Sequence, residues 1–66
     1  MSLSDNLRAL RKQKGYSQEQ LAERLNVSRQ AVSKWENGVS DPSTSNLLAL
    51  AKLYGISAED LLKEVE

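Results

Sequence analysis

Apolar residues recur three and four positions apart in five segments of the chain, which is the spacing of a helix that buries one face. A serine precedes each segment and can cap the helix that follows. After Ser2, Ser17 and Ser57 an acidic or amide residue stands three positions later, as in a capping box. No segment alternates as a strand does. The sequence therefore predicts an all-α protein, a compact five-helix bundle with helices over 3–13, 18–25, 29–36, 44–54 and 58–64.

The predicted second and third helices are joined by only three residues, Asn26, Val27 and the capping Ser28. A connection this short forces the helices to cross steeply, as in a helix-turn-helix. Asn26 tolerates the left-handed backbone of a sharp turn, and Ala22 provides a small side chain where the helices would touch. These features favour a central helix-turn-helix, although a generic corner of a helical bundle would use the same residues.

The chain has 66 residues, enough for one small domain over 1–66 with its core in 4–62. It contains no cysteine and no histidine, so thiolate and imidazole chemistry is absent. We therefore expect no metal, no cofactor and no enzymatic activity. Apolar stretches such as 47–51 are too short to span a bilayer, and no secretory signal precedes them. We expect no membrane association and a cytoplasmic location.

Charge is divided unevenly along a chain whose formal net charge is zero. Residues 1–35 carry seven basic and three acidic side chains, whereas residues 36–66 carry two basic and six acidic ones. A domain with one basic half can present a positive face to phosphate. The alternative is a chance division of charges over solvated helix faces.

The outer face of the predicted third helix carries Arg29, Gln30 and Lys34. Arginine pairs with guanine, glutamine pairs with adenine, and lysine binds guanine or phosphate. The predicted second and fourth helices begin with uncharged polar residues, at 17–18 and 43–45, and helix N-termini offer free N–H groups to phosphate. These positions indicate nucleic-acid binding, with an ordinary solvated helix surface as the alternative.

Residues 4–62 resemble the phage-repressor family of helix-turn-helix domains, the Cro and Xre-like five-helix fold. The most specific motifs are Gln18-x-x-Leu21-Ala22 and Trp35-Glu36-Asn37-Gly38. The resemblance implies a lambda-repressor-like fold that binds double-stranded DNA sequence-specifically, with the third helix in the major groove. The matching runs are 7–11, 17–22 and 27–38, followed by Pro42, 50–51, 55–57 and 61–62.

The resemblance also implies roles for individual residues. Arg29, Gln30 and Lys34 would read base edges. The remaining DNA contacts that we expect come from polar residues at helix starts or beside the third helix: Gln18, Ser28, Ser33, Asn37, Ser43 and Thr44. Asn26 replaces a glycine common in the family, and Asp41 lies in a loop that is often basic in relatives.

The leading hypothesis is therefore a transcriptional regulator, and we expect it to act as a repressor. It would bind a two-fold operator as a homodimer. Dimerisation is expected near the C-terminus through Leu62 and Val65. The alternative is an antitoxin or another protein-interaction module on the same fold, which would bind a protein partner through Leu48, Leu53, Leu62 and Val65.

Overall fold

The computed structural model describes residues 2–63, which form five helices and no strand. This arrangement confirms the predicted all-α, five-helix architecture. Within the described residues, no helix has both the length and the apolar character needed to cross a membrane. The first four helices have the predicted bounds. The helices are α1 (Leu3–Gln13), α2 (Gln18–Leu25), α3 (Arg29–Glu36), α4 (Thr44–Tyr54) and α5 (Ala58–Leu62).

The prediction for the last helix, 58–64, was wrong at its C-terminal end. The helix α5 ends at Leu62, and Lys63 has extended backbone with φ −69° and ψ 132°. The side-chain amide of Asn6 on α1 donates a hydrogen bond to the carbonyl of Lys63. This contact holds the end of α5 against α1. A local sequence pattern cannot predict it, because the two residues are far apart in the chain. Glu64, also predicted to be helical, lies outside the described residues.

Every helix begins with a serine whose hydroxyl accepts a hydrogen bond from the backbone N–H three residues on. Such a cap satisfies one of the free N–H groups in the first turn and contributes about 1 kcal/mol. At Ser2 and Ser17 the reciprocal bond is also present, which completes the capping box. At Ser57 only the serine half of the predicted box is found among the described residues.

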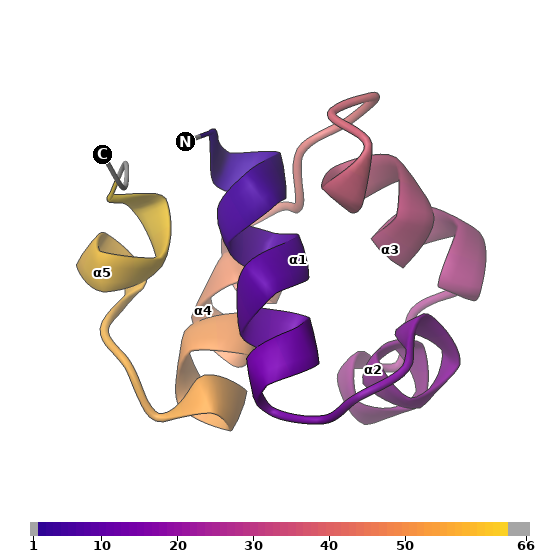
Figure 1. Ribbon diagram of the computed structural model, residues 1–66, viewed down its shortest axis with the longest axis horizontal. Coiled ribbons are helices and arrows are strands. Elements are labelled where there is room, and N and C mark those ends of the chain that lie inside the picture. Colours follow the sequence, from indigo (N-terminus) through magenta and orange to yellow (C-terminus); the bar gives the residue numbers. More distant parts are fainter. Residues whose placement is uncertain (1, 64–66) are drawn as a thin grey trace.

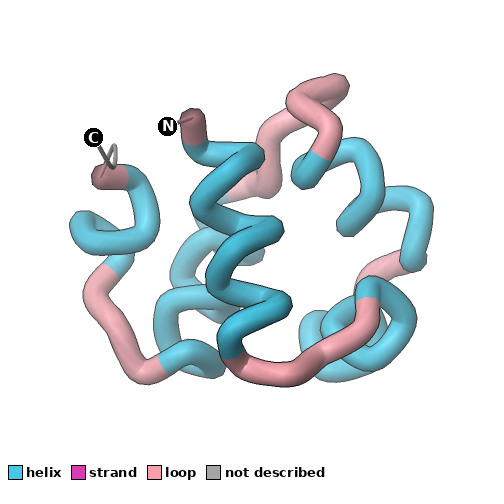
Figure 2. The backbone as a smooth tube through the Cα atoms, viewed as in Figure 1, coloured by secondary structure: helices cyan, strands magenta, loops and turns pink. Residues whose placement is uncertain are grey.

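The turn between α2 and α3 has the predicted form. Asn26 adopts the left-handed conformation, with φ 59° and ψ 44°, and ends α2. The N–H of Val27 then donates to the carbonyl of Ala22 at 2.9 Å, which closes the turn. Ala22 and Val32 are both buried where the two helices meet. A steep helix-turn-helix corner follows, visible as the short loop between α2 and α3 in Figure 2.

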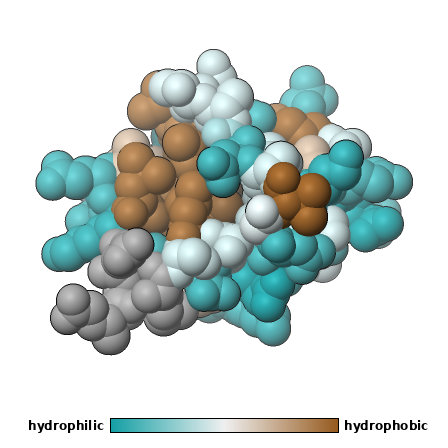
Figure 3. Space-filling model, turned by 90° about the horizontal axis from the view of Figure 1, so that it is seen from above, coloured by the Kyte–Doolittle hydropathy of each residue, from teal (hydrophilic) through white to brown (hydrophobic). Residues whose placement is uncertain are grey.

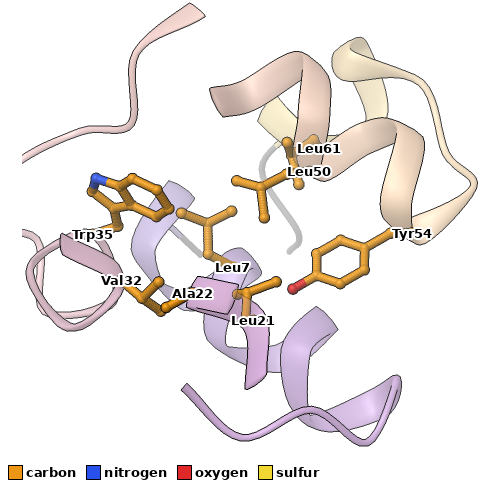
Figure 4. Packing of buried hydrophobic residues seen from close by; sticks show 8 residues of the cluster. All are labelled: Leu7, Leu21, Ala22, Val32, Trp35, Leu50, Tyr54 and Leu61. Atoms are coloured by element: carbon orange, nitrogen blue, oxygen red, sulfur yellow. The ribbon is translucent and has the colours of Figure 1, made fainter. Parts of the chain in front are cut away.

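The helix α1 occupies the centre of the molecule (Figure 1). In this view α2 and α3 lie to one side of it, α5 lies to the other side, and α4 lies behind. One hydrophobic cluster joins all five helices (Figure 4). The core therefore fixes α2 and α3 from one side and leaves their other side free. The cluster consists of Leu7, Leu21, Ala22, Val32, Trp35, Leu50, Tyr54 and Leu61.

Candidate nucleic-acid interface

The helix α3 has one buried side and one exposed side. Val32 and Trp35 are inserted into the core, with exposed fractions of 0% and 6%. Arg29, Gln30 and Lys34 are exposed, as expected for side chains that must meet a ligand. Because the buried residues fix the rotation of the helix about its axis, these three polar side chains are held on the outside.

Two more of the expected site residues form a pair at the C-terminal end of α3. The amide of Asn37 donates to the hydroxyl of Ser33 at 3.3 Å. The side-chain oxygen Oδ1 of Asn37 accepts a hydrogen bond from Nη2 of Arg8 on α1 at 3.1 Å, and the same nitrogen donates to the backbone carbonyl of Glu36 at 2.8 Å. Arg8 thus ties the last turn of α3 to α1 and leaves Asn37 exposed.

Gln18, the first residue of α2, is half-buried and contacts the end of α3. Its Nε2 donates to Oε1 of Glu36 at 3.2 Å. The structure therefore brings the start of α2 and the end of α3 together through one carboxylate. Gln18 was expected at the interface, but its partner Glu36 was not among the predicted site residues.

A buried ion pair between α1 and α3 supports this contact. Nε of Arg11 lies 2.7 Å from Oε2 of Glu36, and Nη2 of Arg11 lies 3.1 Å from Oε1. Glu36 is only 2% exposed. The hydrogen bond to Glu36 raises the pKa of Arg11, so the guanidinium stays charged. Arg11 also donates from Nη1 to the carbonyl of Tyr16, at 2.9 Å, in the loop that leads into α2.

The helical register contains a signal for this pair, although the pair was not predicted. Glu36 stands four residues after Val32, and Arg11 stands four residues after Leu7, so each charge lies on the apolar side of its helix. Opposite charges on two buried faces predict a buried ion pair. Both residues entered the prediction only through the charge of the two halves and through the family motifs, not as partners of each other.

The remaining expected residues, Ser28, Ser43 and Thr44, lie at helix starts and are exposed. The hydroxyl of Ser28 accepts from the N–H of Ala31 at 3.1 Å, and that of Ser43 accepts from the N–H of Asn46 at 3.2 Å. Each hydroxyl keeps its own O–H as a donor, because capping uses only an acceptor lone pair. Ser43 caps α4 and Thr44 is its first residue, and the loop 37–43 separates α4 from α3.

Residues 7–61, most of the chain, match the family model described as Helix-turn-helix. The chain belongs to this helix-turn-helix family. Its relatives and its fold confirm the resemblance to phage repressors and the lambda-repressor-like architecture.

Two relatives of the helix-turn-helix domain align with all 66 of its residues. The transcriptional activator BcrR of Enterococcus faecalis is 41% identical, and the domain covers 32% of BcrR. The transcriptional regulator ImmR of Bacillus subtilis is 39% identical, and the domain covers 52% of ImmR. The chain thus spans between a third and about half of the length of these relatives.

A crystal structure of the c2 repressor of phage P22 in complex with a synthetic operator has the same fold. The two chains superpose with a TM-score of 0.88 at 36% identity, and the alignment covers 96% of each.

Proposed function

We propose that this helix-turn-helix domain binds double-stranded DNA sequence-specifically, with α3 in the major groove, as part of a transcriptional regulator. The observation that carries the proposal is the exposed face of α3, where Arg29, Gln30 and Lys34 stand opposite a fully buried side. An α-helix fits the major groove, and these side-chain types match base edges there. The likeness to a repressor solved with its operator supports the same assignment.

The proposal divides the site residues into two groups. Arg29, Gln30 and Lys34 read bases, because they stand in the N-terminal and middle turns of the exposed face. The others bind the sugar-phosphate backbone through neutral donors and set the position of the domain on the duplex. These are Gln18, Ser28, Ser33, Asn37, Ser43 and Thr44.

We also propose that the domain binds a two-fold operator as a homodimer. Leu62 is 50% exposed and Leu48 is 57% exposed, while the neighbouring Leu61 is fully buried. Viewed from above, hydrophobic surface gathers left of centre, toward the side of α5 (Figure 3). A dimer contact on this side would leave α3 free for DNA. Val65, also expected in the contact, lies outside the described residues.

Repression is the proposed mode of regulation, in the cytoplasm, without a cofactor or catalytic activity. BcrR is named an activator and the P22 c2 protein is named a repressor, so proteins similar to this domain include both activators and repressors. The runner-up function is an antitoxin or another protein-interaction module. It would use the exposed leucines Leu48 and Leu62 rather than α3.

The test is selection of binding sites from a random duplex pool, followed by titration of the selected operator with variants. Gln30→Ala should weaken operator binding by about 1–3 kcal/mol and relax specificity at one position in each half-site. Gln13→Ala is the matched control, because Gln13 is an exposed glutamine at the end of α1. It should leave affinity and specificity unchanged.

Binding should also weaken with salt. If the complex neutralises about four to six phosphates, log K should fall against log salt with a slope of roughly −4 to −5. A flat salt response, or retention of no duplex at low salt, would contradict DNA binding and favour the protein-interaction module.

A further inference from the structure

The carboxylate of Glu36 collects three hydrogen bonds from two helices. Oε2 accepts from Nε of Arg11, while Oε1 accepts from Nη2 of Arg11 at 3.1 Å and from Nε2 of Gln18 at 3.2 Å. A carboxylate paired with a guanidinium can only accept hydrogen bonds. The Gln18 amide must therefore face Glu36 with its NH2 group, because the flipped amide would place two oxygens against each other.

This contact leaves part of the Gln18 amide available. A primary amide carries two N–H donors, and Glu36 takes one of them. The second N–H remains on a half-buried side chain at the start of α2, beside the free backbone N–H groups of the first turn. A phosphate oxygen is a natural acceptor for this set of donors.

Arg11 makes the arrangement compatible with a phosphate. A buried carboxylate close to the interface would repel an anion, but the guanidinium of Arg11 balances its charge at 2.7 Å. The bond from Arg11 to the Tyr16 carbonyl also fixes the backbone two residues before Gln18. Arg11 of α1 therefore holds the Glu36 carboxylate directly and the Gln18 amide through that carboxylate, and it also fixes the start of α2.

We propose that Glu36 is a positioning residue, which preorganises the side-chain amide of Gln18 for a phosphate of the DNA backbone. This inference rests on the proposed DNA-binding function and extends it to a residue that does not itself contact DNA. A glutamine held before binding loses less side-chain freedom on binding, and that freedom corresponds to about a two- to tenfold change in affinity.

The test is a double-mutant cycle of Gln18→Ala and Glu36→Gln, titrated with the selected operator duplex. In Glu36→Gln a single amide oxygen replaces the two carboxylate oxygens, so Arg11 and Gln18 compete for one acceptor and the hold on the Gln18 amide is weakened. Glu36→Gln should weaken binding about two- to tenfold in the presence of Gln18 and less than about twofold in the Gln18→Ala background. All four proteins are compared at a temperature where circular dichroism shows them folded.

An equal loss in both backgrounds would overturn the inference, since Glu36 would then act through the fold or through α3. No loss in either background would also overturn it. Wild-type protein that binds no duplex would instead refute the proposed function itself, so the two failures are distinguishable.

A second measurement needs no variant and covers the case in which Glu36→Gln fails to fold. Nitrogen relaxation of side-chain amides in the wild-type protein should show the Gln18 NH2 group to be as ordered as the backbone. The NH2 group of the exposed Gln13 should be mobile and is the internal control. Equal mobility of the two amides would overturn the preorganisation.

Discussion

The buried hydroxyl of Tyr54 makes the stability of the domain depend on alkaline pH. Tyr54 is 4% exposed, and its ring points into the core toward Leu21 (Figure 4). Its hydroxyl has no hydrogen-bond partner among the described residues. Burial, together with the negative charge of Glu36 and against the opposing effect of Arg11, raises the pKa of Tyr54 to about 12.

The size of the effect follows from the two pKa values of Tyr54. An unfolded tyrosine titrates at about 10, so the folded state, at about 12, favours the neutral phenol. The stabilisation is fully present below pH 10 and is lost as the pH rises through 12. Linkage gives a loss of roughly 0.4 kcal/mol at pH 10, roughly 1.4 kcal/mol at pH 11 and on the order of 2–3 kcal/mol above pH 12. A domain of this size has only about 3–5 kcal/mol of core stabilisation in total.

Tyr54→Phe removes the titrating group and keeps the ring. Urea unfolding followed by circular dichroism, at steps from neutral pH to about pH 11, gives the free energy of unfolding of both proteins. At neutral pH the variant should be at least as stable as wild type, because it removes a buried hydroxyl without a partner. The stability difference between the variant and wild type should then grow by roughly 1.4 kcal/mol up to pH 11, while all other titrations cancel in the difference. A difference that stays constant with pH would refute the reasoning.

Three further changes test other parts of the structure. Asn26→Ala should be about 1 kcal/mol less stable than Asn26→Gly in urea unfolding, because φ at this position is 59°; equal stabilities would contradict a strained turn. Glu36→Ala should cost about 1–3 kcal/mol, because it leaves the partly buried Arg11 guanidinium without its acceptor, and Arg11→Met with Glu36→Leu should recover most of that loss in thermal melts. If Glu36→Ala alone melted at the same temperature as wild type, the ion pair between Arg11 and Glu36 would not contribute to stability. Leu62→Asp should turn the proposed homodimer into a folded monomer in sedimentation, since this side chain is 50% exposed, and an unchanged dimer would reject the placement.

The helices were predictable because their signals are local. A capping serine acts on the N–H three residues away, and the apolar stripe repeats within each helix, so the bounds of α1 to α4 follow from short windows of sequence. The turn at Asn26 is equally local, because three residues between two helices leave few backbone conformations.

The candidate site was predictable only in part. Val32 and Trp35 mark the buried side of α3, and the exposure of Arg29, Gln30 and Lys34 follows from their places in the helical register. The assignment of these residues to DNA contacts stays a prediction. The buried carboxylate beneath the site was missed, because its partners stand 25 and 18 residues away in the sequence.

The sequence by itself determined five helices, their starting residues, the left-handed turn and the outward face of α3. All of these depend on interactions between residues at most about four positions apart, so the sequence pattern is enough to predict them. The tertiary structure decided which charges are buried together, where α5 ends against Asn6, and that the hydroxyl of Tyr54 is enclosed. Those outcomes depend on how distant helices pack, because burial and pairing arise only when segments far apart in the chain exclude water from the same volume.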